Sequence, residues 1–282
     1  MDPRAMSRVS ADIGPQDQGA DVETLQLFLH RFGYLPAPEP RMAIPLGRAS
    51  EFPAQGEFDD QTRQALTRYQ AFRGLAETGL LDAETRTTMA KPRCGFPDLF
   101  IGVPEAYAFN GGKWSKTDLR FHVLNASKDL TLEQVRTAVR SALDLWQAVS
   151  MLRFSETSSA SGADLTIRFG TGDHGCGHPF TEGADGKDNV LAHAFPPPPA
   201  GGTYAGQTHI DDADTWSVSA TPKFGAKDLV TVVAHEVGHA LGLSHSNVKT
   251  ALMFPDYAGP HRHLDQDDID AITALYGPKA SA

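Results

Sequence analysis

The sequence predicts an α+β protein of two parts, a small helical unit followed by a larger part that mixes strands with helices. In residues 20–90 the apolar positions recur at the three- and four-residue spacing of amphipathic helices. Beyond residue 115, two segments alternate apolar and polar residues as strands do, with helical patterns between and after them. The 282 residues leave room for both parts, because single domains usually span roughly 100–200 residues.

Three short helices make up the predicted N-terminal unit. Val22, Leu25 and Leu29 share one face of the first helix, and a loop rich in proline, glycine and alanine follows it. A second helix is expected from Asp59, and Asp82 is expected to cap a third, since an aspartate before a helix accepts a hydrogen bond from the free N–H groups of its first turn. Such short helices enclose a modest core, which suits a binding module or a prodomain.

The larger part is predicted to place strands and helices around a core of its own. Thr131 and Gln134 form a capping-box pattern that opens a long amphipathic helix. Residues 170–216 are rich in glycine, aspartate and histidine, so we expect this region to be mostly loop. The expected elements are a strand at 119–123, a helix from 131 to 149, a strand at 165–169, a helix at 227–243 and a helix after Asp265.

Composition and charge argue against two classes of partner. The formal net charge of -10 repels a phosphate backbone, so we expect no nucleic-acid partner. No apolar run approaches the ~18 residues that a membrane span needs, and we expect a monomer without such a span. The opening residues, MDPRAMSRVS, lack the apolar centre of a signal peptide, which indicates a native targeting segment missing from this chain.

The strongest chemical signal is the run AHEVGHALGLSH, from Ala234 to His245. His235 and His239 are four residues apart, so on a helix both imidazoles project from one face and can meet on one ion. Gly242 permits a sharp turn after the helix, because glycine adopts left-handed backbone conformations without penalty. His245 can then return as a third ligand. Three neutral histidines leave a fourth position open for water, as in catalytic zinc sites.

Glu236 directly follows the first of these histidines and is expected to lie near the metal without binding it. Zinc lowers the pKa of bound water to about 7, and a nearby carboxylate can take the proton during attack on a carbonyl. We therefore predict Glu236 as the catalytic base. The alternative, an amphipathic helix with incidental histidines, does not explain why three histidines, a glutamate and a glycine occur at these offsets.

This motif resembles the zinc signature of the metzincin peptidases, HExxHxxGxxH followed by a methionine turn. The segment ALMFP around Met253 is similar to that turn, in which the family places a methionine beneath the three histidines. Ser244 and Ser246 beside the third histidine, and the ending LDQDDIDAITALYG, resemble the matrixin branch, the matrix metalloproteinases. The resemblance covers about 85% of the chain, and no hemopexin-like domain is expected after Gly277.

Cys94 lies in the segment PRCGFPD, which is similar to the matrixin cysteine switch. The resemblance implies that its thiolate occupies the open zinc position in a latent form, with Arg93 and Asp98 paired to hold the segment in place. A disulfide between Cys94 and Cys176 is the alternative for the two cysteines of this chain.

A second zinc site, structural in matrixins, is implied by the resemblance between residues 173 and 216. His174, His193 and His209 fall at its histidine positions. Cys176 stands where the family has an aspartate, and three histidines with one cysteine form a reasonable tetrahedral zinc shell. His178 is a competing fourth ligand.

Calcium is the other metal that the resemblance implies. Asp185, Asp211 and Asp214 match the carboxylates of one family calcium site, and calcium prefers hard oxygen ligands. A second calcium site is not expected, because Gln207 replaces the aspartate that it would need. The alternative for these acidic residues is a solvated loop surface.

The resemblance also implies the fold in more detail. We expect a twisted five-stranded mixed sheet with three helices, preceded by a three-helix prodomain like peptidoglycan-binding modules. Thr231 and Tyr257 are expected to border the pocket for the residue after the scissile bond. Four segments are expected: a disordered N-terminus or expression scar (1–19), the helical prodomain (20–91), the switch and activation segment (92–106) and the catalytic domain (107–278).

Two functions from different classes follow from these expectations. The first is a secreted latent metalloendopeptidase that cleaves protein substrates once the prodomain is removed. The second is a protein whose N-terminal unit binds peptidoglycan or another glycan, with an incidental or inactive C-terminal domain. The complete histidine set with Glu236, and PRCGFPD directly after the helical unit, favour the peptidase.

Overall fold

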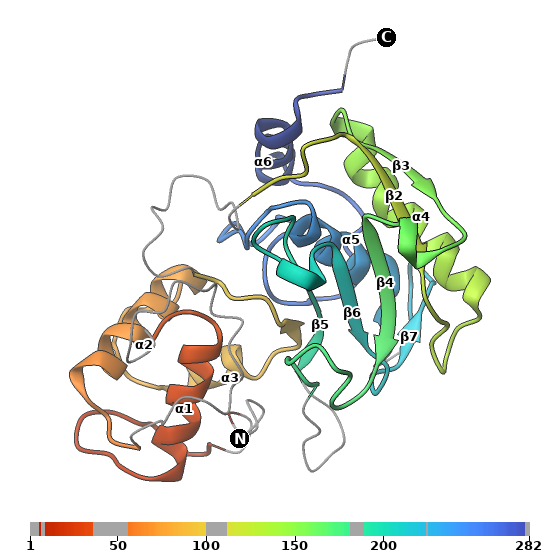
Figure 1. Cartoon of the computed structure of the whole chain (residues 1–282). Coiled ribbons are helices and arrows are strands. Elements are labelled where there is room, and N and C mark those ends of the chain that lie inside the picture. The colour runs from red at the N-terminus through yellow and green to blue at the C-terminus, as the bar shows by residue number, and fades with distance from the viewer. Residues whose placement is uncertain are drawn as a thin grey trace. The chain divides into compact units, whose positions relative to one another are not determined.

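The computed structural model describes residues 6, 9–35, 56–99, 112–180, 189–223 and 225–279. By internal contacts the chain divides into two compact units (Figure 1). The first comprises Met1–Pro92, Pro97–Pro104 and Gly172–Asn189, and the second comprises Arg93–Phe96, Glu105–Thr171 and Val190–Ala282. The segment Arg93–Phe96 therefore belongs to the larger unit, whereas the residues on either side of it belong to the smaller one.

The first unit contains the three predicted helices, α1 (Ala20–Arg31), α2 (Asp60–Arg73) and α3 (Ala83–Met89). The expected cap at Asp82 is confirmed, because its side chain accepts a hydrogen bond from the Thr85 N–H, and Asp59 caps α2 in the same way by accepting one from the Thr62 N–H. Edge-to-face contacts of Tyr69 with Phe28 and with Tyr34 form part of the core.

Residues before α1 carry packing that the sequence pattern did not indicate. Ile13 is buried and exchanges two backbone hydrogen bonds with Leu81, 3.2 and 2.9 Å long. This pairing ties the chain ahead of the first helix to the segment that leads into α3. The expected domain boundaries remain predictions.

The second unit is built on a mixed sheet of six strands in the order β1-β5-β6-β4-β2-β3. Only the β5–β6 pair is antiparallel. The strands are β1 (Arg93–Cys94), β2 (Asp118–Val123), β3 (Arg153–Glu156), β4 (Leu165–Gly170), β5 (Val190–Ala194) and β6 (Gln207–Asp211). A separate small pair joins β7 (Trp216–Ser217) to β8 (Lys227–Asp228), and short 3-10 turns lie at Ala160–Gly162 and Gly202–Tyr204.

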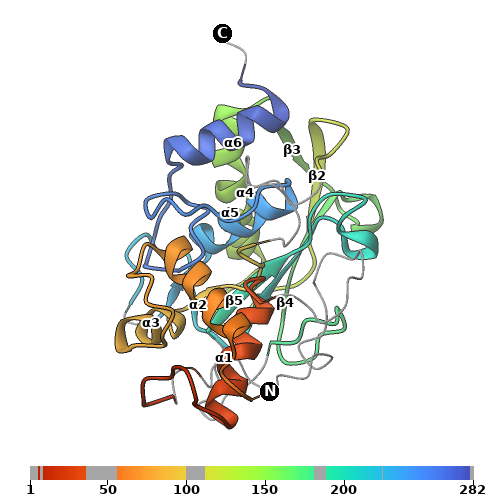
Figure 2. The same cartoon turned by 90° about the vertical axis from the view of Figure 1, so that its left-hand side faces the viewer.

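Helices α4 (Leu132–Val149) and α5 (Leu229–Ala240) pack side by side against the sheet, and α6 (Gln266–Tyr276) follows near the end of the described chain (Figures 1 and 2). The Trp146 indole on α4 donates a 2.9 Å hydrogen bond to the Ala234 carbonyl on α5. The capping box of Thr131 and Gln134 is present as predicted, and Asp265 caps α6. One shared core thus sets the position of α5 against the sheet.

The α+β fold class is confirmed, and the structure adds details that the sequence prediction lacked. Most described residues of 170–216 lie outside helices and strands, as predicted, but the region also contains β5 and β6, which the sequence conceals because β5 is buried at every position and shows no alternation. Strand β3 was also missed. Helix α5 is shorter than predicted at both ends, since Asp228 caps it and the backbone turns at Gly242. The sixth strand, β1, adds to the five expected.

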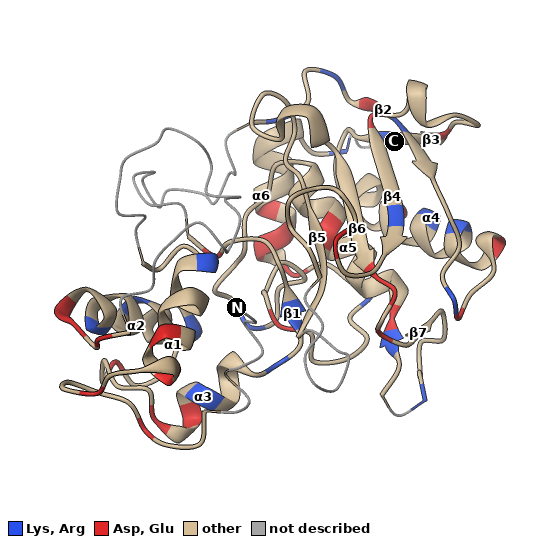
Figure 3. Ribbon diagram, turned by 60° about the horizontal axis from the view of Figure 1, so that its bottom comes forward, with Lys and Arg blue, Asp and Glu red and all other residues tan. Residues whose placement is uncertain are grey.

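Acidic and basic side chains are distributed over the elements of both units (Figure 3). Among the described residues, no helix combines the length and apolar character needed to cross a membrane.

Candidate metal centre

Helix α5 carries the first half of the site. Every residue of α5 is buried, including His235, Glu236 and His239. Burial of polar side chains is costly unless they are paired or bind a metal, so their presence on the most enclosed helix indicates a function. Because the helix advances 3.6 residues per turn, His235 and His239 lie on the same face.

A glycine turn brings the third histidine back to this face. Gly242 has a φ of 111°, and a Cβ placed on it would lie 2.3 Å from the Gly112 carbonyl oxygen. Any residue with a side chain would therefore be strained in this backbone conformation and would also clash with the neighbouring carbonyl. Beyond the turn the chain reverses, and His245 Nε2 lies 3.2 Å from His235 Nε2. His239 Nε2 lies at the same distance from His235 Nε2.

The other ring nitrogens show which atoms face the metal position. His235 Nδ1 lies 2.7 Å from the Leu252 carbonyl oxygen, and His239 Nδ1 lies 2.8 Å from that of Leu243. A carbonyl only accepts, so both Nδ1 atoms carry the proton and both Nε2 atoms present lone pairs. Lone pairs facing each other repel unless a cation lies between them. Tetrahedral zinc with bonds of about 2.0–2.1 Å places its nitrogens about 3.3 Å apart, which these distances fit.

Cys94 completes a group of four buried side chains with these histidines, whose ligand atoms all lie within 4.8 Å of one another. Strand β1 places it there: the Cys94 N–H donates to the Pro255 carbonyl and the Gly95 N–H donates to the Ala192 carbonyl of β5. Burial, followed by the charge of Glu236, raises the pKa of the Cys94 thiol well above its ordinary value. A zinc ion reverses this effect, because coordination deprotonates a thiol.

Glu236 lies at the group of four without belonging to it. Its carboxyl group is 1% exposed and hydrogen-bonded to the Cys94 thiol, and burial raises the pKa of Glu236 to about 8. Its Oε2 atom has no hydrogen-bond partner among the described residues. An unsatisfied buried carboxylate oxygen beside three imidazole lone pairs fits a zinc ion with a reacting water.

The turn around Met253 packs against α5, since a Cβ on Gly238 would lie 2.3 Å from the Met253 sulfur. Leu252 and Met253 donate their N–H groups to the Asp268 carboxylate at 2.7 and 3.0 Å. The Leu252 carbonyl is also the one that orients His235. Asp268 is therefore a residue of the site that sequence analysis missed, since its only local signal was a place in the first turn of α6.

Phe96 is a second residue that sequence analysis did not assign to the site. Its fully buried ring stacks on the imidazole of His239, with centroids 4.1 Å apart and an interplanar angle of 17°, and meets His245 edge-on. The Phe96 N–H also points at the Cys94 sulfur, 3.3 Å away. No motif spacing could have predicted this contact.

Thr231 and Tyr257 both meet Asp228, the residue that caps α5. The Thr231 hydroxyl donates to the Asp228 carboxylate at 2.6 Å, and the Asp228 N–H donates to the Tyr257 hydroxyl at 2.7 Å. Arg262 forms a salt bridge with the same carboxylate at 2.6 Å. Asp228 and Arg262 were not singled out from the sequence.

The four residues expected at a second zinc site fall into two pairs, one in each compact unit. In the first unit, the Cys176 sulfur lies 3.0 Å from His174 Nε2. In the second, His193 Nε2 lies 3.3 Å from His209 Nδ1. Burial lowers the pKa of the competing His178 to about 4, so its imidazole is neutral. Neither cysteine takes part in a disulfide, which removes the alternative pairing of Cys94 with Cys176.

The structure describes only some of the residues expected to bind calcium or to brace the cysteine segment. Asp185 lies outside the described residues. Asp211 and Asp214 are buried, and Asp211 accepts a hydrogen bond from the Ala213 N–H, so calcium binding there remains a prediction. In the first unit Asp98 accepts a 2.7 Å hydrogen bond from the Tyr34 hydroxyl. In the second, Arg93 donates to the Cys94 carbonyl. The Arg93–Asp98 pairing remains a prediction.

Comparison with known proteins agrees with the fold of both units. The family model for matrixin, peptidase family M10, matches residues 113–277, and a peptidoglycan binding domain model matches residues 18–89. The match to matrixin covers more than half of the 282 residues, and the chain belongs to that family.

Similar individual proteins come from bacteria and animals. Karilysin of Tannerella forsythia is 46% identical over 171 residues, 61% of this chain and 34% of karilysin. Human matrix metalloproteinase-16 is 35% identical over 269 residues, 90% of this chain and 41% of the relative. Rat stromelysin-2 is 40% identical over 222 residues, 76% of this chain and 42% of the relative. The matched region thus spans less than half of each relative.

Proposed function

We propose that this chain is a zinc-dependent endopeptidase that hydrolyses peptide bonds in protein substrates. The observation that carries the proposal is the group of imidazole Nε2 atoms, 3.2 Å apart, next to the buried carboxylate of Glu236. Three neutral histidines leave one coordination position open, which is the arrangement of catalytic rather than structural zinc sites.

The chain's own residues divide the work of the reaction. When bound, zinc polarises the scissile carbonyl and makes water more acidic. His235, His239 and His245 hold the ion, and the carbonyls of Leu252 and Leu243 orient the first two rings. Glu236 takes a proton from the attacking water and then passes it to the leaving amine. Burial raises the pKa of Glu236 to about 8, and a cation held by the three histidines would lower it again and so favour the ionised carboxylate that can accept a proton.

The same proposal includes a latent form. Cys94 lies with the three histidines in one buried group, which supports a form in which its sulfur would take the metal position that the reacting water needs. The backbone of residues 94 and 95 supports this arrangement, because its hydrogen bonds to the Pro255 and Ala192 carbonyls hold the cysteine on two sides. Removal of the N-terminal unit would then free the metal. We further propose that the protein is secreted, as a zymogen with calcium at Asp185, Asp211 and Asp214.

A second zinc belongs to the proposal as well. The Cys176 sulfur lies close to the His174 imidazole, and the imidazoles of His193 and His209 lie close to each other. Such short distances between ligand atoms are expected of side chains that bind an ion together. His209 Nε2 contacts the Gln207 side-chain oxygen, so the proton lies on Nε2 and Nδ1 presents its lone pair toward His193. Cys176 is preferred to His178 as the fourth ligand.

Glu236→Gln tests the peptidase directly. The amide keeps the shape of the side chain but cannot take a proton, so peptide turnover should fall by at least about 100-fold, the lower end for loss of a general base. Zinc content, measured by atomic emission on the same sample, should not change. Turnover within tenfold of the parent protein would remove Glu236 from the mechanism.

A second candidate function concerns the N-terminal unit alone, and the match of residues 18–89 to a peptidoglycan binding domain favours it. Under this reading α1 to α3 bind a bacterial wall polymer. Sedimentation of the whole chain with insoluble peptidoglycan distinguishes the two. Retention of the protein in the pellet would support wall binding, and a protein that stays in solution would leave the unit only its inhibitory role.

A further inference from the structure

The turn that follows α5 lies between the second and the third of the metal-binding histidines. Helix α5 ends at Ala240, and the chain reverses at Gly242 before it arrives at His245. Within this turn the Leu243 carbonyl accepts a hydrogen bond from His239 Nδ1. The last carbonyls of a helix have no partner within the helix itself. The turn therefore orients one ligand and carries the next, and its own carbonyls need partners from elsewhere in the chain.

Two aromatic residues supply these partners. The Trp114 indole N–H donates to the Ala240 carbonyl at 2.9 Å, and the Tyr276 hydroxyl donates to the Leu241 carbonyl at 2.6 Å. The Trp114 backbone N–H in turn donates to the Tyr276 hydroxyl at 3.0 Å. Burial raises the pKa of Tyr276 to about 12, so its hydroxyl keeps the proton that it donates. The two residues thus form one connected set of hydrogen bonds on the turn.

The backbone just before Trp114 completes the contact with the turn. A Cβ on Gly242 would lie 2.3 Å from the Gly112 carbonyl oxygen, so the two segments touch directly. Gly112, Trp114 and Tyr276 are called the turn clamp below. Together they hold residues 240–242 by two hydrogen bonds and one close backbone contact.

The turn clamp is itself fixed to the rest of the larger unit. The Lys113 ammonium group donates to the Leu275 carbonyl of α6 at 2.7 Å. The Trp114 ring packs against Gly206, just before β6, where a Cβ would lie 2.9 Å from the ring. Because the clamp is joined both to α6 and to the edge of a sheet strand, it can hold the turn in place.

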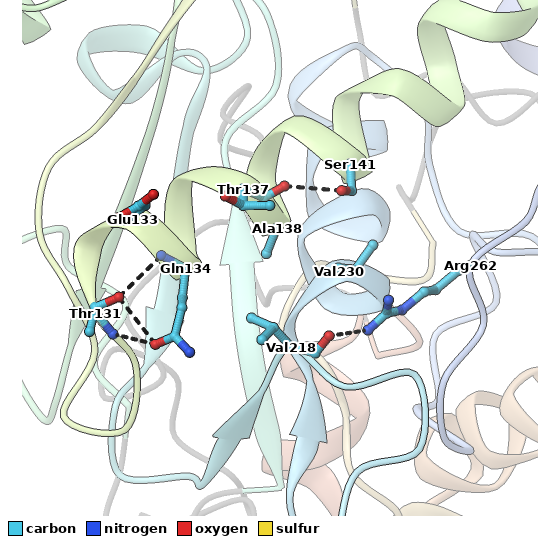
Figure 4. Close-up of a pocket in the computed structure, with 9 residues that line it drawn as sticks. All are labelled: Thr131, Glu133, Gln134, Thr137, Ala138, Ser141, Val218, Val230 and Arg262. Atoms are coloured by element: carbon cyan, nitrogen blue, oxygen red, sulfur yellow. Dashed lines mark hydrogen bonds between the residues drawn. The ribbon is translucent and has the colours of Figure 1, made fainter.

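The amino end of α5 is bordered differently. Val230, the second residue of the helix, lines a cavity of about 350 Å³ together with residues of α4 (Figure 4). In the same cavity the Ser141 hydroxyl donates a 3.0 Å hydrogen bond to the Thr137 carbonyl, within α4. Ser141 thus makes a hydrogen bond of similar length to those of the clamp, which can be removed without affecting the turn.

We propose that Trp114 and Tyr276 are positioning residues for the catalytic metal, which hold the turn so that the histidines on both sides of it keep their Nε2 atoms together. The proposal rests on the proposed peptidase function, because it concerns the metal of that site. A loose turn spends part of its time with the ligands apart, and zinc affinity falls by the fraction of time lost. Partners that orient metal ligands from outside contribute roughly 10–100-fold to metal affinity or activity.

The test uses the full-length chain with Cys94→Ala, so that only the three histidines hold the catalytic zinc. Trp114→Phe and Tyr276→Phe each keep an aromatic ring and lose one donor. Zinc is removed with graded amounts of a chelator, and His245→Ala identifies the step of the titration that belongs to this site. The dissociation constant of that step should rise at least about fivefold in each single variant, near the lower end for an outer partner. The double variant should fall short of the product of the two effects, because both donors act on one turn.

Ser141→Ala is the matched control, because its lost hydrogen bond lies beside α5 but away from the turn. Its dissociation constant for the same zinc should stay within about twofold of the parent, as expected of an independent position. The step that belongs to the other zinc should not move in any variant. Unchanged constants in Trp114→Phe and Tyr276→Phe would overturn the proposal. An equal rise in Ser141→Ala, or at both zinc steps, would also overturn it, because that result indicates general destabilisation.

Hydrogen exchange follows the turn itself, independently of activity. The Leu243 amide donates to the Gly238 carbonyl at 3.0 Å and therefore reports whether the turn is closed. Its exchange should be at least about tenfold faster in zinc-free Trp114→Phe than in the zinc-free parent, and unchanged in Ser141→Ala. Equal exchange in Trp114→Phe and the parent would overturn the proposal. A parent that binds zinc at the three histidines but hydrolyses no peptide would contradict the proposed function alone, and zinc affinity and exchange would then still decide whether the turn clamp acts as proposed.

Discussion

At the scale of single residues, Gly238 and Phe96 determine how closely other side chains pack against α5 and its histidines. A Cβ on Gly238 would lie 2.3 Å from the Met253 sulfur and 3.1 Å from the Trp146 ring, so only glycine lets α5 approach both side chains. Above the same helix the Phe96 ring covers the imidazole of His239. Together these contacts leave the histidines little freedom, which keeps the three Nε2 atoms together for metal binding.

Phe96→Ala should expose the cysteine that closes the metal group. The ring is fully buried beside the thiol, so its loss opens a path for solvent and removes packing worth about 3–5 kcal/mol of unfolding free energy. We expect an aqueous thiol reagent to label Cys94 at least tenfold faster, with the labelled residue identified by mass spectrometry. Phe96→Leu, which keeps most of the volume, is the control. Equal labelling rates in all three proteins would contradict the covering role.

At the scale of secondary-structure elements, the short strand β1 is the element that places Cys94 beside the three histidines. Only two residues long, it pairs in parallel with β5, and Gly95 beyond it lies so close to β5 that a Cβ would meet Val190 at 2.7 Å. A short edge strand of this kind is weakly held on its own. Its stability therefore depends on what Cys94 binds.

The proposed latency depends on the contact of Cys94 with the metal group and is tested by Cys94→Ser. A serine hydroxyl is a much weaker zinc ligand than a thiolate, so the intact variant should hydrolyse a peptide at least tenfold faster than the intact parent. Both proteins are compared at equal zinc occupancy. An organomercurial that captures the thiol should activate the parent and leave the variant unaffected. Equal rates before treatment would mean that PRCGFPD is only a linker.

The whole molecule joins segments that are distant in sequence. Residues 172–189 belong to the compact N-terminal unit, and the Asn189 side-chain amide donates a hydrogen bond to the Met89 carbonyl there. His174 and Cys176 are therefore placed by the packing of one unit, and His193 and His209 by the antiparallel pairing of β5 with β6 in the other.

At the scale of the whole molecule, the zinc content of the protein tests the proposed second zinc site. The whole chain should hold about two zinc ions, one for each proposed ligand set. Cys176→Ser should lower the melting temperature and the zinc content more than it lowers turnover, because the catalytic histidines are untouched. His178→Ala is the matched control and should change neither. A parent count of one zinc, or a larger loss in His178→Ala than in Cys176→Ser, would contradict the proposed set.

What the sequence alone determined were the features that depend on neighbours a few residues apart. The spacing of His235 and His239, the turn at Gly242 and the caps at Asp59, Asp82 and Asp265 follow from helix geometry and local hydrogen bonding. Together with the resemblance to the metzincin signature, these patterns led to the predicted fold class and to the proposed histidine set.

Only the tertiary structure decided which distant residues meet. Strand β5 shows no alternation because both of its faces are buried, and Phe96, Asp268 and the Asp228–Arg262 pair acquire their roles from residues far along the chain. A contact between such residues depends on how the core of α4, α5 and the sheet packs. That packing is a property of the whole fold, which no local spacing encodes.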